Sequence, residues 1–254
     1  MNGTVYLVGA GPGAPDLLTL RAATVLARAD IVFHDALVHP QTLALAEHAI
    51  RIPVGKRCGR HSTVQRFIDK RLVDAAARYA VVVRLKGGDP MLFGRAQEEI
   101  AALEAAQIRY EVVPGVTAAL AAAAQIGTSL TQRGSVRSFA FATPRVGDGE
   151  AASDWIEGFR GADAGAIYMG LRQAPAIAAA LIAAGRDAAT PVAIVVDASS
   201  PDSLAHYTTL ANLPAFADLV TTAPALLLIG PQFHARRASR AATAPDLRLL
   251  ATAC

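Results

Sequence analysis

Apolar and polar positions alternate along the first half of the chain in a pattern typical of strands connected by helices. The expected strands lie at residues 4–8, 30–38, 81–85 and 110–115, and the expected helices at 17–29, 62–80 and 94–108. Short β-branched runs separated by longer segments of helical period favour an α/β fold with a largely parallel sheet. The alanine-rich run "AALAAAAQ" from Ala118 indicates a further helix.

The alternation is interrupted once. Residues 127–138 are polar and rich in turn formers, and strand and helix patterns resume after them. The sequence therefore predicts an N-terminal α/β domain at 1–128, a linker at 129–137 and a C-terminal α/β domain at 138–254. The last part of the chain, after Gly230, loses its periodicity and is expected to form an irregular tail.

Composition narrows the class of protein. The 254 residues are 53% hydrophobic and 18% charged, with a net charge of +3. Cys58 and Cys254 show no CxxC spacing, so neither a metal site nor a disulfide framework is expected. The apolar runs are shorter than the about 20 residues of a membrane helix, and no signal peptide is apparent. A cytoplasmic protein that does not bind membranes is expected.

A glycine turn follows the first strand. Gly9-Ala10-Gly11-Pro12-Gly13 stands where a dinucleotide-binding fold has G-x-G-x-x-G, but Ala14 takes the place of the third glycine. Pro12 also removes a main-chain amide from the turn that would hold a pyrophosphate. A nicotinamide-dependent oxidoreductase, with Asp35 as its ribose ligand, is one alternative. It leaves the block from Gly87 to Arg95 unexplained.

Basic residues gather in the second fifth of the chain. Residues 51–100 hold eleven Lys and Arg against five Asp and Glu, a local balance of +6. Lys56, Arg57 and Arg60 share the glycine-bounded loop "VGKRCGRH", and Arg133 follows in the linker. Such a cluster suits a substrate with several carboxylates. Aromatic residues make up only 6% of the chain and no known nucleic-acid motif is present, so we expect no binding to nucleic acid.

Seven segments carry a resemblance to a known family. They are "VYLVGAGPGAPDLLTLRA", "ADIVFHDALV", "VGKRCG", "VVVRLKGGDPMLFGRAQEE", "VVPGVTAA", "SLTQRG" and "AIYMG". In this order and spacing, over most of residues 3–230, the chain resembles the tetrapyrrole methylases, and within them the uroporphyrinogen-III C-methyltransferases. Residues 81–99 are the most distinctive part.

The resemblance implies a fold, a reaction and a set of site residues. It implies two α/β domains with the active site in the cleft between them, a homodimer, and S-adenosylmethionine as methyl donor with S-adenosylhomocysteine as product and no metal. The implied reaction is C-methylation of uroporphyrinogen III to precorrin-2, in sirohaem or cobalamin biosynthesis; methylation of a later precorrin is an alternative. The implied catalytic residues are Asp35 and Lys56. The implied cofactor contacts are Pro12, Gly87, Gly88, Asp89, Leu92, Thr117, Ala118, Met169, Ala198 and Ala225.

Elementary chemistry is compatible with these roles. Gly87 and Gly88 let a backbone approach a ligand closely. Asp89, at a strand end, suits either ribose hydroxyls or the cationic end of the donor. Asp35 suits the positive charge that develops on a methylated pyrrole, or a proton relay, or simply a turn. Lys56 suits either a carboxylate arm of the substrate or proton transfer, and Arg57, Arg60 and Arg133 are candidates for binding the substrate.

The chain also departs from the family pattern. His34 replaces a frequent tyrosine before Asp35, and Gln132 replaces a histidine in the segment "SLTQR". Pro144 stands in place of a glycine in a "TGH" segment, and Ala198 in place of a glycine whose backbone contacts the cofactor in relatives. These changes allow an altered substrate or a weakly active paralogue.

Overall fold

The computed structural model describes residues 2–54, 65–146, 154–219 and 223–234. The chain folds into two compact units. The first comprises Met1–Ala121 and Asp197–Asp202, and the second comprises Ala122–Val196 and Ser203–Cys254. The first unit is therefore discontinuous in sequence. The domain limits predicted from the sequence remain a prediction.

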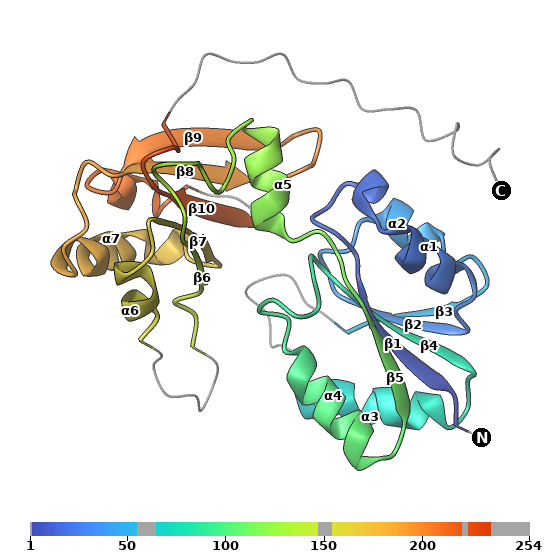
Figure 1. The fold of residues 1–254 in the computed structure, drawn as a ribbon. Coiled ribbons are helices and arrows are strands. Elements are labelled where there is room, and N and C mark those ends of the chain that lie inside the picture. Colours follow the sequence, from blue (N-terminus) through green and yellow to red (C-terminus); the bar gives the residue numbers. More distant parts are fainter. Residues whose placement is uncertain (1, 55–64, 147–153, 220–222, 235–254) are drawn as a thin grey trace. The chain divides into compact units, whose positions relative to one another are not determined.

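The first unit is built on a five-stranded parallel sheet (Figure 1). Its strands are β1 (Thr4–Gly9), β2 (Ile31–His34), β3 (Ile50–Pro53), β4 (Val81–Lys86) and β5 (Arg109–Val113), in the order β3-β2-β4-β1-β5. Every pair in this sheet is parallel. The predicted α/β class with a parallel sheet is confirmed for this half. Strands β1 and β4 lie in the interior of the sheet and are buried on both faces, and β4 carries Arg84 and Lys86 among its apolar residues.

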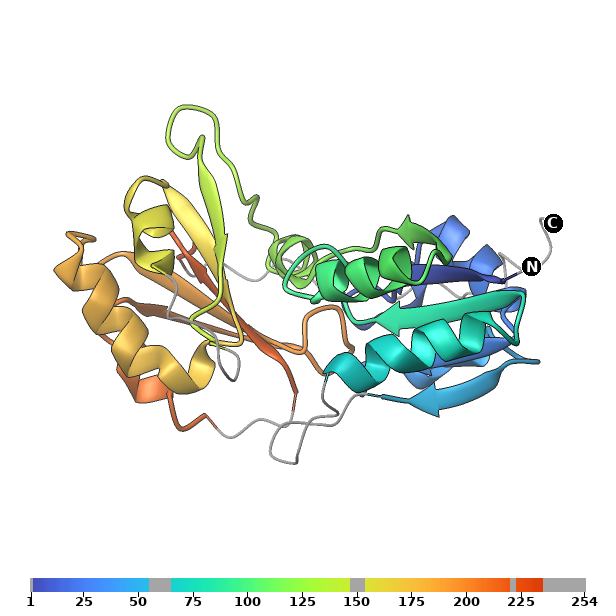
Figure 2. The same ribbon diagram turned by 90° about the horizontal axis from the view of Figure 1, so that it is seen from below.

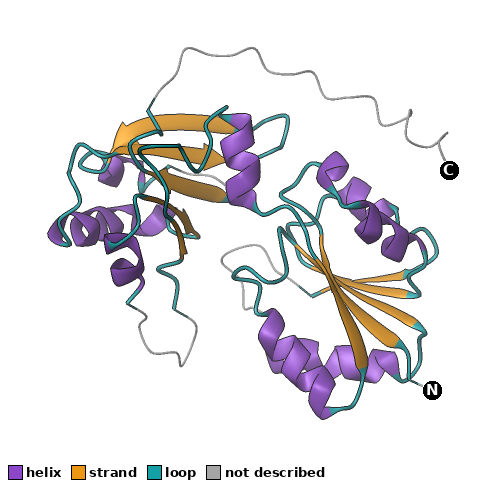
Figure 3. Cartoon of the chain, in the orientation of Figure 1, coloured by secondary structure: helices purple, strands orange, loops and turns teal. Residues whose placement is uncertain are grey.

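Helices cover both faces of this sheet (Figure 3). They are α1 (Leu20–Ala27) and α2 (Pro40–Ala44) on one face, and α3 (Gln65–Ala76) and α4 (Ala96–Ala105) on the other. Successive side chains of β1 alternate between the two cores: Val5 and Leu7 pack with α3 and α4, and Val8 packs with α1. Each fully buried aliphatic side chain contributes about 1.5–3 kcal/mol.

The second unit contains a mixed sheet. Its strands are β6 (Phe139–Ala142), β7 (Ala164–Tyr168), β8 (Pro191–Val196), β9 (Leu204–Thr209) and β10 (Ala225–Ile229), in the order β6-β7-β10-β8-β9. Only β6 and β7 are parallel; the other pairs are antiparallel. Helices α6 (Trp155–Arg160) and α7 (Ala174–Ala183) pack with one face of this sheet (Figure 2). Helix α5 (Ala118–Gln125) begins in the first unit and ends in the second.

The order of the first sheet determines where a site can form. Strand β1 lies between β4 and β5, and all three run in the same direction. Their carboxyl ends therefore lie at one edge, and the loops that follow them are neighbours. Ligands of open α/β sheets bind at this edge.

Candidate active site

Main-chain hydrogen bonds join the loops that follow β1 and β4. Gly88 donates its amide to the carbonyl of Gly11 at 2.7 Å, and Gly11 donates back to Gly88 at 3.2 Å. The amide of Ala10 donates to the carbonyl of Lys86 at 2.7 Å. The two loops are thus fixed to each other by their backbones.

Three glycines allow this approach and bring in the loop after β5. A Cβ on Gly9 would lie 2.6 Å from both the α-carbon and the nitrogen of Gly115, and a Cβ on Gly115 would overlap the carbonyl oxygen of Gly88. Gly88 also has a φ of 69°, which residues other than glycine adopt at a cost. Backbone therefore packs on backbone at this edge of the sheet.

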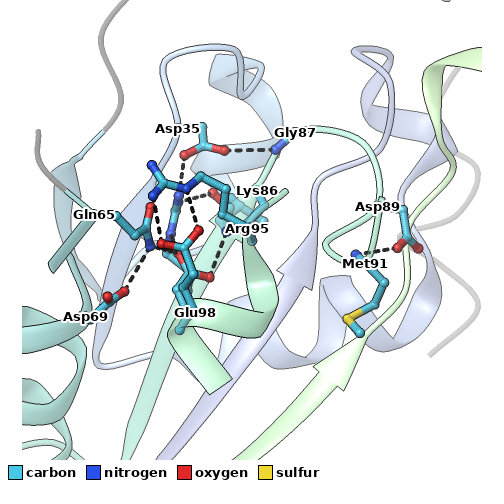
Figure 4. A network of polar contacts seen from close by, with 12 residues as sticks. Asp35, Gln65, Asp69, Lys86, Gly87, Asp89, Met91, Arg95 and Glu98 are labelled. Carbon is cyan, nitrogen blue, oxygen red and sulfur yellow. Dashed lines mark hydrogen bonds and ion pairs between the residues drawn. The ribbon is translucent and has the colours of Figure 1, made fainter. Parts of the chain in front are cut away.

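Asp89 links the loop after β4 to the loop after β5. Its Oδ1 accepts the amide of Met91 at 2.8 Å, and its Oδ2 accepts the amide of Gly115 at 2.9 Å. Figure 4 shows the first of these contacts. A carboxylate has about four acceptor positions, so two remain for a ligand. The orientation of this carboxylate is set before any ligand binds.

The loop at residues 197–202 packs on the glycine turn within the first unit. Ser199 Oγ accepts the amide of Ala14 at 3.0 Å. The left-handed conformations of this loop are taken by Asp197 (φ 52°) and Ser199 (φ 71°), and not by Ala198. Alanine in place of the family's glycine therefore introduces no backbone strain here, although the side chain of Ala198 is buried.

The predicted cofactor residues fall into two groups. Those in the first unit follow the carboxyl ends of β1, β4 and β5 or belong to the 197–202 loop; they are Pro12, Gly87, Gly88, Asp89, Leu92, Thr117, Ala118 and Ala198. Met169 and Ala225 belong to the second unit. Met169 directly follows Tyr168, which pairs with Leu226, so both residues of this group lie at one end of the second sheet.

Met169 is held in an unusual conformation for a methionine. Its φ is 57°, its side chain is 45% exposed, and its sulfur lies 3.9 Å from a guanidinium nitrogen of Arg145. A left-handed non-glycine residue costs free energy and is found most often at functional sites. Met169 is therefore not part of the buried core of the second unit.

Asp35, which follows β2, belongs to an extended charged network (Figure 4). Its Oδ1 accepts Arg84 at 2.5 Å, and its Oδ2 lies 3.4 Å from the amide of Gly87. Arg84 Nε also donates to Glu99 at 2.9 Å, and Lys86 Nζ donates to the other Glu99 oxygen at 2.7 Å. The carboxylate of Asp35 is therefore fixed by β4 rather than projecting freely from a turn.

The environment shifts the pKa values of both cations of this network. Burial lowers the pKa of Arg84, but Asp35 and Glu99 together outweigh burial and raise that pKa above its ordinary value. For Lys86 burial is the largest effect and, with the nearby charge of Arg84, it lowers the pKa despite the contact with Glu99. Glu99 thus compensates two buried cations at once.

This network corrects the interpretation of the basic stretch. The local balance of +6 includes Arg84 and Lys86 among the cations available to an acidic substrate, whereas both are buried and paired. The sequence carries a signal for this: the two cations alternate with apolar residues on a central strand, so they share one buried face and require a partner. That partner is Glu99 on α4, the helix that covers the same face. The sequence pattern alone did not identify Glu99 as the partner.

The four remaining predicted residues do not belong to the described part of the first unit. Lys56, Arg57 and Arg60 lie outside the described residues. Arg133 is exposed in a turn of the second unit that is closed by two hydrogen bonds of 2.9 Å between Gln132 and Val136.

The glycine turn does not support nicotinamide binding. The amides of Ala10, Gly11 and Ala14 already donate to protein acceptors, and Pro12 has none. Asp35, which would have bound the ribose, pairs with Arg84 instead. The oxidoreductase alternative is therefore unsupported.

The first sheet thus has a glycine-lined carboxyl edge with a fixed aspartate, and the second unit has a mixed sheet. Residues 4–214 match the tetrapyrrole (corrin/porphyrin) methylases. The match covers most of the chain, and the chain belongs to this family.

Individual relatives agree with this assignment. The chain is 45% identical over 230 residues to a siroheme synthase of Azotobacter vinelandii, covering 90% of this chain and 50% of that protein. It thus spans about half the length of the curated relatives it matches. Among solved structures it resembles the uroporphyrin-III C-methyltransferase of Thermus thermophilus complexed with S-adenosylhomocysteine, with 38% identity, a TM-score of 0.79, and coverage of 90% of this chain and 97% of that one.

A cobalt precorrin-4 methyltransferase is also similar, with 26% identity, a TM-score of 0.79, and coverage of 91% of this chain and 96% of that one.

Among the described residues, no helix is both long and apolar enough to cross a bilayer. The same part of the chain contains no group of three His, Cys, Asp or Glu side chains suited to a metal ion.

Proposed function

We propose that this chain transfers methyl groups from S-adenosylmethionine to carbon atoms of uroporphyrinogen III, giving precorrin-2 for sirohaem or cobalamin synthesis. One observation carries the proposal. The chain is 38% identical to a uroporphyrin-III C-methyltransferase complexed with S-adenosylhomocysteine, and the match covers 97% of that protein. Methylation of a later precorrin is the second candidate. The lower identity of 26% to the cobalt precorrin-4 enzyme makes it the weaker one.

The residues of the first unit fit the methyl donor. The glycines at the ends of β1, β4 and β5 keep side chains away from the edge, so a ligand there meets main-chain groups. Asp89 offers carboxylate oxygens whose orientation is fixed by two amides, which suits the hydroxyls or the ammonium group of the donor. When bound, S-adenosylmethionine supplies an electrophilic methyl group on a positively charged sulfur.

The protein's own residues position the reactants and compensate charge. A pyrrole carbon is already electron-rich, so no covalent nucleophile from the chain is needed. Asp35, which is partly exposed, accepts a hydrogen bond from a pyrrole N–H and stabilises the positive charge that develops on the ring. Loss of a proton from the macrocycle restores its neutrality. Lys56, Arg57, Arg60 and Arg133 are proposed to bind the carboxylate arms of the substrate.

We further propose that the protein acts as a homodimer in the cytoplasm. The resemblance to the family supports the dimer, and two cysteines without paired spacing suit a reducing compartment. Sedimentation equilibrium of the purified chain tests the dimer directly.

The function is tested by incubating the purified chain with S-adenosylmethionine and enzymatically generated uroporphyrinogen III, followed by mass spectrometry of the tetrapyrrole. A gain of two methyl groups is expected, and Asp35→Ala should slow it strongly while leaving a measurable rate. Asp74→Ala is the matched control, because Asp74 forms an exposed ion pair with Lys70 on α3. Binding of S-adenosylhomocysteine without methyl transfer would exclude uroporphyrinogen III and point to a later precorrin. Absence of cofactor binding would overturn the methyltransferase function.

A further inference from the structure

Arg84 divides its donors among three acceptors in different directions. Its terminal nitrogens donate to Asp35 Oδ1 at 2.5 Å and to the carbonyl of Leu85 at 3.1 Å, while Nε donates to Glu99 at 2.9 Å. The side chain is only 5% exposed. Because the guanidinium is planar and rigid, these contacts fix its position and its rotation.

Glu99 anchors the guanidinium from the interior. It is fully buried on α4, and its two oxygens also accept Lys86 at 2.7 Å and Gln65 at 3.3 Å. Charges alternate along the chain of contacts from Asp35 to Arg84, Glu99 and Lys86, and they cancel. A fold can hold such a group only if every member is paired.

The four charged side chains joined by these ion pairs differ in exposure. The side chains of Arg84, Glu99 and Lys86 are between 0% and 5% exposed, whereas that of Asp35 is 31% exposed. Buried ion pairs can often be replaced by apolar residues of similar volume without loss of stability. Stability alone therefore does not account for these ion pairs, and Asp35 is the exposed member that they orient.

We propose that Arg84 is a positioning residue that acts through Asp35. By holding Oδ1, it leaves Oδ2, beside the amide of Gly87, as the oxygen offered to the pyrrole N–H groups of the substrate. Glu99 in turn orients Arg84. This inference rests on the proposed function, in which Asp35 contacts the substrate.

A double-mutant cycle separates this role from an independent one. Asp35→Ala, Arg84→Met and the double variant are compared with the unmodified chain for kcat and KM with uroporphyrinogen III, and for the Kd of S-adenosylhomocysteine. Arg84→Met should lower kcat by about 10- to 100-fold, the loss expected when a catalytic group is misplaced by about an ångström. The Kd of S-adenosylhomocysteine should stay within about twofold, because Asp89 and the glycine loops are untouched.

The decisive comparison is between the double variant and Asp35→Ala. If Arg84 acts only through Asp35, removing it lowers kcat no further once Asp35 is gone. Effects of the two substitutions that multiply would overturn the inference. Arg21→Met is the matched control, since Arg21 forms an exposed pair with Glu111, and it should leave kcat unchanged.

Two further variants keep the test valid if Arg84→Met does not fold. Arg84→Lys retains the charge opposite Glu99, but its donors share one nitrogen and cannot reach Asp35, Glu99 and Leu85 together. Its kcat should therefore still fall, and full activity would contradict the proposed geometry. Arg84→Met with Glu99→Gln keeps the network electrically neutral while removing the contact to Asp35. It should be folded by circular dichroism and its kcat should be about 10- to 100-fold below that of the unmodified chain; an unchanged kcat would overturn the inference.

The outcomes for the inference and for the function are distinguishable. An unmodified chain that binds S-adenosylhomocysteine but methylates no uroporphyrinogen III refutes the proposed function, and the inference with it. An active unmodified chain with multiplicative effects refutes the role of Arg84 alone.

Discussion

The carboxylate of Asp89 accepts the main-chain amide of Gly115 across a distance of 2.9 Å, so a loop after β4 is fixed to a loop after β5 on the far side of β1. Its other oxygen closes a local turn with the amide of Met91. One side chain therefore sets the spacing of two loops and faces the proposed donor site.

Replacing Asp89 should weaken the binding of S-adenosylhomocysteine, the product that the methyl donor leaves behind. Asp89→Ala removes both acceptors for the amides and the charge, so the Kd of S-adenosylhomocysteine should rise at least about tenfold, corresponding to one charge-assisted hydrogen bond. Asp89→Asn keeps one acceptor oxygen and should have the smaller effect. Isothermal titration calorimetry measures both, with Asp74→Ala as a surface control, since Asp74 forms an exposed pair with Lys70 on α3. An unchanged affinity in Asp89→Ala would remove Asp89 from the donor site.

Gly115 should not tolerate a side chain. A Cβ there overlaps the carbonyl oxygen of Gly88 and lies 2.9 Å from the α-carbon of Gly9, so backbone must move. Gly115→Ala is expected to lower the free energy of unfolding by about 1–3 kcal/mol, as overpacked sites do. Urea unfolding followed by circular dichroism measures this change.

Gly158 in α6 provides the opposite case. Nothing lies within 4 Å of a Cβ built on it. Gly158→Ala should therefore stabilise the protein by about 0.5–1 kcal/mol, the difference in helix propensity. If Gly115→Ala does not lower the free energy of unfolding relative to Gly158→Ala, the close packing of the loops after β1, β4 and β5 is refuted.

Removing the buried carboxylate of Glu99 should cost more stability than removing an exposed one. Glu99→Ala leaves Arg84 and Lys86 buried without their common partner, and a loss of about 3–5 kcal/mol is expected. Glu157→Ala breaks an exposed pair with Arg160 and should change stability by less than about 1 kcal/mol. Equal effects in denaturant unfolding would show that Glu99 is not an effective partner of the two cations.

Asp163 should make stability depend on acidic pH. The amides of Arg137 and Ser138, and then the hydroxyl of Ser138, donate to its carboxylate and hold its pKa below the ordinary 3.8. Because the folded-state pKa is the lower one, this contribution is complete above pH 3.8 and is lost as the pH falls through the folded-state value.

The measurement compares Asp163→Asn with the unmodified chain in urea at neutral pH and well below pH 3.8. The variant should be less stable at neutral pH, and the difference should shrink in acid. Ser138→Ala, which removes one of the donors, should give an intermediate result. A difference independent of pH would show that the charge of Asp163 contributes nothing.

The periodicity of the sequence predicts the first sheet well. The β-branched run that forms β4 and the glycine turn after β1 are located by the pattern alone. Strand β3 is missed, because Ile50–Pro53 is short and largely exposed at the edge of the sheet. Strand β9 is missed because Leu204–Thr209 is mostly polar and lacks the apolar run of a buried strand. It becomes a strand by pairing with β8, and its own residues do not reveal that partner.

The site is predicted less completely than the fold. Gly87, Gly88 and Asp89 follow directly from strand-end chemistry and the family resemblance. The pairing of Arg84 with Asp35 does not, because these residues are 49 positions apart and meet only through the neighbouring registers of β2 and β4. Local sequence shows that a buried cation needs a partner, but only tertiary structure shows which one.

The discontinuity of the first unit bears on how members of this family can be recombined. A fragment ending before residue 197 would carry the glycine turn but lack Ser199, which accepts the amide of Ala14. A chimaera joined within the linker would combine a turn from one parent with a 197–202 loop from the other. Hybrids that inherit both segments from the same parent should fold with this contact intact, so the unit of exchange is not a continuous half of the chain.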